Sequence, residues 1–300
     1  DVALTVDAGS GYDRVYAEAS GNISANVNVG EGGSDVYMTA YNGSDVTATV
    51  TGGSGEDYVN LSATTEGAIN ATVAGGEGYD SVTVHGGGDH SNGNNEGNHL
   101  SLTGVEQVDV SETYNSHGNY TDITADGDLH SASLSHNGAE SYLTVNTGGY
   151  DGSSTGDVTL TVNGGYGYDN VRVNAESGAN VSLNASYGEG GSYTYVNAYH
   201  GGDVTLTVDA GYGYDRVYAE TSGNLTANVS VGEGGSYVRA YSGSNIDLTV
   251  NAGGEGYDQV RASTYAGGSI DATLNLGNGE GYVQLGAENG GNVTADVTFG

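Results

Sequence analysis

The chain has 300 residues, with 55 Gly, one Phe, one Met and no Pro, Cys or Trp. Its 38 Asp and Glu face only five Arg and no Lys, and the formal net charge of −33 argues against nucleic acid and membrane insertion as partners. The lack of Cys excludes disulfides and thiolate chemistry, and the apolar runs are too short for a transmembrane helix. Because the apolar residues are mostly Val, Ala, Leu and Ile, we expect a thin core of small side chains.

An internal repeat of about 22 residues begins at the first residue. Residues 1–22 and 203–224 differ at only three of 22 positions. The interval 69–157 spans 88 residues, four times 22, and we expect further rungs of degraded sequence there. We therefore predict one continuous solenoid of about 13 rungs over residues 1–300. Recognisable rungs begin near Asp1, Ile23, Asp45, Ile69, Asp157, Val181, Asp203, Leu225, Ile246, Ile270 and Val293.

Each rung contains two short segments in which apolar and polar residues alternate. In the rung at residue 203 these are segments 204–208 and 216–220, joined by a Gly-rich turn and followed by a Ser/Gly/Asn turn. Alternation of period two indicates strands with one face inward and one outward. The prediction is an all-β fold, a parallel β-solenoid of the β-roll or β-helix kind with two strands per rung. The expected inward residues are Val204, Leu206, Val208, Val217 and Ala219.

The turn after the first strand carries a nonapeptide motif, G-G-x-G-x-D-x-U-x, in which U is a large aliphatic residue. Segments 52–60, 75–83, 164–172 and 253–261 fit it, and segments 8–16 and 210–218 miss only the first Gly. An Asp in such a turn can cap its own backbone N–H groups, or it can offer hard oxygen ligands to Ca²⁺. Both roles remain open from the residues alone.

By this motif the chain resembles the RTX calcium-binding β-roll of large secreted bacterial proteins. The resemblance implies Ca²⁺ clasped between rungs by turn carbonyls and carboxylates. It differs in rung length, about 22 residues against 18, and in alternate turns such as 30–34, 188–192 and 232–236. After these turns, Asp35 restores the family Asp once, whereas Tyr193 and Tyr237 take its place elsewhere. The implied metal residues are Asp13, Asp57, Asp80, Asp169, Asp215 and Asp258.

Segment 86–156 is irregular, with partly degenerate rungs and a His-containing loop that begins at Gly86. Six of the seven His lie between His85 and His136, but their spacing matches no common metal motif. We expect a polar surface loop here, with a transition-metal site as the alternative.

The two strands of a rung present different outward faces. The first presents mainly Thr and Asn, whereas the second presents Tyr and all five Arg, for example Arg216 and Tyr218. The Tyr/Arg face fits either cross-rung ladders that fix the register or a surface that binds polysaccharide or a neighbouring solenoid.

No acid/base pair, nucleophile constellation or phosphate-binding loop is recognisable, and we expect no enzymatic activity. The prediction is a secreted, extracellular or cell-surface structural protein, a subunit or segment of a fibre, matrix or adhesin stalk stiffened by Ca²⁺. Its expected partners are copies of itself in fibres, or the rest of a longer chain, and extracellular polysaccharide. The alternative is a module that binds glycan or ice on a flat face, although Asp7, Asn26, Asp247 and Asp271 interrupt the Thr array that ice binding needs.

Overall fold

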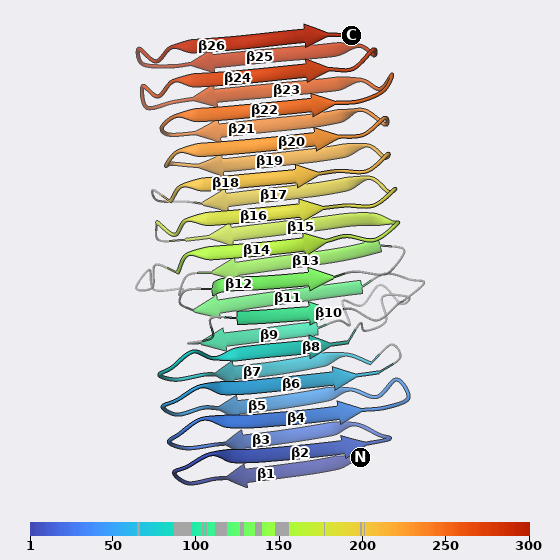
Figure 1. Cartoon of the computed structure of the whole chain (residues 1–300), viewed down its shortest axis with the longest axis vertical. Coiled ribbons are helices and arrows are strands. Elements are labelled where there is room, and N and C mark those ends of the chain that lie inside the picture. Colours follow the sequence, from blue (N-terminus) through green and yellow to red (C-terminus); the bar gives the residue numbers. More distant parts are fainter. Residues whose placement is uncertain are drawn as a thin grey trace. The chain divides into compact units, whose positions relative to one another are not determined.

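The protein is described by a computed structural model in which every described element of secondary structure is a β-strand (Figure 1). The structure describes residues 1–64, 67–86, 98–103, 105, 107–111, 119–126, 129–135, 140–147, 156–176, 178–198, 200 and 202–300. The strands form parallel ladders, which confirms the predicted all-β parallel β-solenoid. The chain divides into two compact units, Asp1–Gly149 and Tyr150–Gly300.

In unit 1 the strands alternate between two sheets, and each strand pairs with the second strand before it and the second strand after it. We call the sheet built from the first strand of each rung, whose outward residues are mainly Thr and Asn, the Thr sheet, and the sheet built from the second strand, which carries the outward Tyr and Arg, the Tyr sheet. The Thr sheet of unit 1 contains β1 (Val2–Asp7), β3 (Ile23–Asn28), β5 (Val46–Thr51), β7 (Ile69–Ala74), β9 (Asn98–Thr103), β11 (Asn119–Asp126) and β13 (Glu140–Thr147). The Tyr sheet of unit 1 contains β2 (Asp13–Ala19), β4 (Ser34–Ala40), β6 (Asp57–Ala63), β8 (Ser81–His85), β10 (Gln107–Ser111) and β12 (Leu129–Ser135).

Unit 2 has the same arrangement. Its Thr sheet contains β14 (Val158–Asn163), β16 (Val181–Ser186), β18 (Val204–Asp209), β20 (Leu225–Val231), β22 (Ile246–Ala252), β24 (Ile270–Leu276) and β26 (Val293–Phe299). Its Tyr sheet contains β15 (Tyr168–Ala175), β17 (Ser192–Ala198), β19 (Asp215–Thr221), β21 (Ser236–Ser242), β23 (Asp258–Thr264) and β25 (Gly281–Ala287).

The core of each unit lies between its two sheets and consists mainly of Val, Ala, Leu and Ile. The expected inward residues of the rung at 203 are all buried, with exposed fractions of 1% to 3%. Thr205 and Thr207 alternate with them on the outer face and are exposed. Equivalent residues stack from turn to turn, as Val208 does between Ala185 and Val229. The predicted alternation is therefore confirmed.

The described strands number 13 in each unit, which at two strands per turn agrees with the expected count of about 13 rungs for the whole chain. The spacing departs from the expectation only in segment 86–156, where most of the corners lie outside the described residues. From β7 to β14 there are seven strand steps, which at two strands per turn makes three and a half turns where four were expected. This half-turn explains why the Thr strands have odd numbers in unit 1 and even numbers in unit 2.

Strands β9 to β13 lie within segment 86–156, where partly degenerate rungs were expected. The His-containing loop lies outside the described residues apart from Gly86 and the strand that follows it. Of the described His side chains, His85 contacts the Ser111 hydroxyl of the next turn through Nδ1 at 2.7 Å. No helix among the described residues is long and apolar enough to cross a membrane.

Candidate functional site

The six Asp residues implied as metal ligands all lie at one corner, where the chain enters the Tyr sheet. Asp13, Asp57, Asp215 and Asp258 begin their strands, Asp80 immediately precedes β8, and Asp169 is the second residue of β15. Asp13 is partly buried, whereas the other five have exposed fractions of 3% or less. These carboxylates therefore point inward at the corner.

Serine occupies the same inward position in alternate turns. The register pairs Asp13 with Ser34 and Ser34 with Asp57, and Ser236 lies likewise between Asp215 and Asp258. The expectation that Asp35 restores the family Asp is wrong, because its register partners are Arg14 and Tyr58 on the outer face. Successive rungs differ in length, so the sequence comparison matched Asp13 with Asp35, one residue beyond its true register partner Ser34. We call the alternating inward residues the Asp/Ser row.

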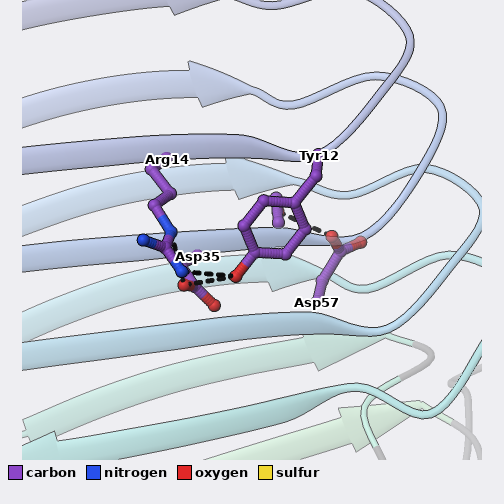
Figure 2. A network of polar contacts seen from close by, with 5 residues as sticks. Tyr12, Arg14, Asp35 and Asp57 are labelled. Atoms are coloured by element: carbon purple, nitrogen blue, oxygen red, sulfur yellow. Dashed lines mark hydrogen bonds and ion pairs between the residues drawn. The ribbon is translucent and has the colours of Figure 1, made fainter.

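Hydrogen bonds link the Asp/Ser row from one turn to the next. The Ser34 hydroxyl donates to Asp57 Oδ1 at 2.6 Å (Figure 2), and the Ser236 hydroxyl donates to Asp258 Oδ1 at 2.9 Å. Asp215 Oδ1 accepts from both the backbone N–H and the hydroxyl of Ser192, at 2.9 and 2.8 Å. Each buried Ser thus donates to the carboxylate of the following turn, which offsets part of the cost of burying that carboxylate.

Asp57 and Asp80 are the only two of the six predicted residues that occupy adjacent turns. Asp80 Oδ1 accepts from the backbone N–H of Asp57 at 2.8 Å, and Asp57 Oδ2 accepts from the backbone N–H of Gly53 at 3.3 Å. Asp57 therefore caps its own turn as well as bonding Ser34. A small cavity of about 10 Å³, close to the volume that one water needs, lies against both carboxylates.

The glycines of the turn motif allow this close approach. A Cβ on Gly52 would collide with Asp57 Oδ2 and with the carbonyl oxygen of Gly75. Gly55, three residues further on, has a φ of 129°, which residues with a side chain rarely adopt. The motif therefore specifies both the backbone path and the room for the carboxylate.

Burial changes the acidity of two carboxylates of the Asp/Ser row, Asp215 and Asp258. It raises the pKa of Asp215 to about 6, although the hydrogen bonds from Ser192 and Gly232 partly oppose this. The pKa of Asp258 is raised for the same reason and is partly lowered by Ser236. The Oδ2 atoms of Asp13 and Asp215 are buried and have no hydrogen-bond partner among the described residues. A cation would find free carboxylate oxygens here.

Calcium needs six to eight oxygen ligands. Within the described ranges, no three side chains of His, Asp or Glu come together as a metal-binding group. The Asp/Ser row offers one carboxylate per turn at most, and Ser separates most pairs. The row fits calcium only if glycine carbonyls of the turns supply most of the ligands, as the family resemblance implies.

On the outer face of unit 1, a polar network joins Tyr12, Arg14 and Asp35 (Figure 2). Arg14 Nε lies 3.2 Å from Asp35 Oδ2, and the Tyr12 hydroxyl donates to the same oxygen at 2.5 Å. Arg14 thus pairs with the carboxylate of the next turn. The contact fixes the register between β2 and β4, as a cross-rung ladder would.

Tyr and Arg side chains also lie in contact along the Tyr sheet of unit 2, with neighbouring rings tilted against each other. The ring of Tyr218 lies 5.5 Å from that of Tyr193 and 5.3 Å from that of Tyr237, measured between centroids. Arg172 lies over Tyr193 at 5.3 Å, and Arg216 lies over Tyr214 at 5.2 Å. The Tyr/Arg face is therefore an ordered array of rings and guanidinium groups.

This array contains a groove of about 490 Å³. Its lining comes from three consecutive strands, β21, β23 and β25, and from the corner that follows β25. Motif analysis did not point to it, because the groove depends on which residues of different turns stand side by side. The lining residues are Tyr237, Arg239, Ala240, Arg261, Ala262, Ser263, Gln284, Gly286 and Glu288.

The opposite corner carries a second ladder that sequence analysis also missed. Here the side chain of the residue before most of the described Thr strands accepts a hydrogen bond from the backbone N–H of its equivalent in the next turn. Asn180 Oδ1 accepts from Asp203 N at 2.8 Å, and Asp203 Oδ1 accepts from Asn224 N at 2.7 Å. We call this set the Asn/Asp ladder. Its members are Asp1, Asn22, Asp45, Asp157, Asn180, Asp203, Asn224, Asn245 and Ser269. An Asn or Asp that recurs just before most Thr strands was its only signal in the sequence.

Comparison with protein-family models, with curated proteins and with solved structures finds no match. The class that the fold defines is the parallel β-solenoid. The functional argument therefore depends on the corners and faces described above.

Proposed function

We propose that the chain is a non-enzymatic structural protein of the extracellular space, a subunit or segment of a fibre, matrix or adhesin stalk. The observation that carries this proposal is the Asn/Asp ladder, in which a side chain of one turn holds the backbone of the next. Together with the strand ladders and the Asp/Ser row, it joins neighbouring turns by backbone and side chain alike over most of the described rungs of each unit. Such repeated bonding suits a load-bearing or spacing element.

Composition supports the same role. The chain has no Cys that could cross-link during export, and its net charge of −33 favours solubility outside the cell. We further propose self-association into fibres, or continuation in a longer chain, with cations to offset the repulsion between acidic surfaces.

The location can be tested by immunogold electron microscopy of cells from the native source, with fractionation of the culture. Label on surface fibres or in the extracellular matrix is the expected result. Label confined to the cell interior would contradict the proposal.

We also propose that Ca²⁺ binds at the Gly-rich Asp turns. The free Oδ2 atoms of Asp13 and Asp215, the adjacent Asp57 and Asp80, and the turn motif support this part. Ca²⁺ bound only by the folded state would raise the melting temperature by several degrees at millimolar concentration.

The measurement is isothermal titration with Ca²⁺ after chelation, together with thermal unfolding. The double variant Asp57→Asn/Asp80→Asn should bind fewer ions, whereas Asp271→Asn, exposed on the Thr sheet, is the matched control. An absence of heat and of any thermal shift in the unaltered chain would leave the Asp/Ser row with a purely structural role.

A further inference from the structure

The groove on the Tyr sheet of unit 2 gathers positive charge in a strongly acidic chain. Arg239, Arg261 and Gln284 occupy directly opposed positions on β21, β23 and β25, and all three are exposed. Two of the five Arg of the protein are thus neighbours at the spacing of adjacent strands, ~4.8 Å. Like charges placed directly opposite each other are destabilising, and neither Arg has a carboxylate within 4.0 Å among the described residues. An external anion would relieve this cost.

The surrounding side chains orient the guanidinium groups. The side-chain amide of Gln259 is oriented so that its oxygen faces Arg261. This oxygen accepts hydrogen bonds from Nε and Nη2 of Arg261 at 2.9 and 2.8 Å. Arg261 also lies over the rings of Tyr237 and Tyr282, at 5.9 and 5.5 Å from their centroids. A guanidinium has five N–H donors, so Arg261 still has donors for a ligand.

Small residues create the hollow beside these arginines. In the column of outward residues next to the Arg pair, Tyr241 on β21 is followed by Ser263 on β23 and Gly286 on β25. A Cβ on Gly286 would meet no atom within 4 Å. The resulting groove of about 490 Å³ therefore has an aromatic wall, a floor of small residues and polar groups at its edge.

We propose that this groove binds an acidic oligosaccharide. A carboxylate or sulfate of the sugar lies between Arg239 and Arg261, which suit bidentate bonds to such groups. The ring of Tyr237 packs against a sugar face, and Gln284 and Glu288 bond its hydroxyl groups. The strand spacing of ~4.8 Å is close to the length of one pyranose unit in an extended chain, so successive sugars meet successive strands.

A glycan fits the groove better than a single carboxylate of another protein, because a lone carboxylate would leave the aromatic wall and the acceptor groups unused. The choice of an extracellular glycan rests on the location proposed above. The binding itself can be measured on the purified chain, so a failure of either proposal can be recognised separately.

The test is calorimetric titration, in the presence of a chelator, with oligogalacturonate, dextran sulfate and neutral dextran. We expect binding of the carboxylated or the sulfated glycan, and the preferred one identifies the anionic group. The double variant Arg239→Gln/Arg261→Gln removes both positive charges and replaces them with Gln, the residue that already occupies the next position of the same column at Gln284. This variant should bind the glycan at least tenfold more weakly. Gly286→Tyr, which fills the hollow with the residue present at Tyr241, should do the same.

The matched control is Arg172→Gln, in the same outward column but outside the groove, which should bind as the unaltered chain does. Circular dichroism checks that each variant is folded. The proposal is overturned if neither acidic glycan binds, if neutral dextran binds equally well, or if a folded groove variant keeps the full affinity.

Discussion

At the scale of single residues, the acidity of Asp215 in the Asp/Ser row links stability to pH. The pKa of Asp215 is raised to about 6 in the folded protein, whereas an unfolded Asp titrates near 4. Between these values the folded state binds more protons than the unfolded state. The free energy of unfolding therefore falls as the pH rises through this window, and Asp215 contributes about 2 kcal/mol of that loss.

This first prediction is checked by denaturant unfolding between pH 4 and pH 7, with Asp215→Asn as the comparison. The variant should lack the part of the slope that belongs to this carboxylate, while the rest of the acidic surface affects both proteins equally. Bound Ca²⁺ would favour the charged form and reduce or reverse the slope, so profiles with Ca²⁺ and with chelator distinguish the two roles of the row. An identical slope in the variant would show that Asp215 is not the group responsible.

A second prediction at this scale concerns the core. Val208 and Val217 are each 1% exposed, so replacing either with Asp would bury an unpaired charge between the sheets. We expect a loss of at least about 3 kcal/mol in the free energy of unfolding. Thr207→Ser, on the outer face of the same strand as Val208, should change it by less than about 0.5 kcal/mol. Comparable losses from inward and outward changes would mean that the register is wrong.

At the scale of the strands and corners, the Asn/Asp ladder gives a third prediction. Asn180→Ala removes the acceptor of the Asp203 backbone N–H. Because the site is exposed and water can replace the lost bond, we expect a cost of only about 0.5–1 kcal/mol. Asn184→Ala, an exposed Asn on β16 outside the ladder, is the control and should cost less. Equal costs in thermal or denaturant unfolding would remove the special role of the corner.

The elements themselves were predictable because alternation and glycine turns are local signals. The inward residues of the rung at 203, such as Leu206 and Ala219, followed directly from period two. The Asp/Ser row did not, because rungs of unequal length leave the register of Ser34 undetermined until the turns are stacked. The groove at Gly286 and the half-turn between β7 and β14 depend on the same stacking.

At the scale of the whole molecule, a solenoid differs from a globular domain in that each turn contacts only its neighbours. Whole turns should therefore be removable if the register is kept. In the Thr sheet of unit 2, Leu206 is equivalent to Leu248, two turns later. Deletion of residues 207–248 joins Leu206 to Thr249 and preserves the alternation of inward and outward residues.

The fourth prediction here is that this deletion variant folds, gives a β-rich circular dichroism spectrum and unfolds cooperatively. Deletion of residues 207–247 removes one residue fewer and places Leu206 directly before Leu248, both of which point inward in the native chain. This one-residue shift turns Thr249 and Asn251 toward the core and Val250 toward solvent. We expect this second variant to be digested rapidly by proteases and to unfold at a much lower temperature. If both deletions behaved alike, the stacking of turns in strict register would not be what holds the fold together.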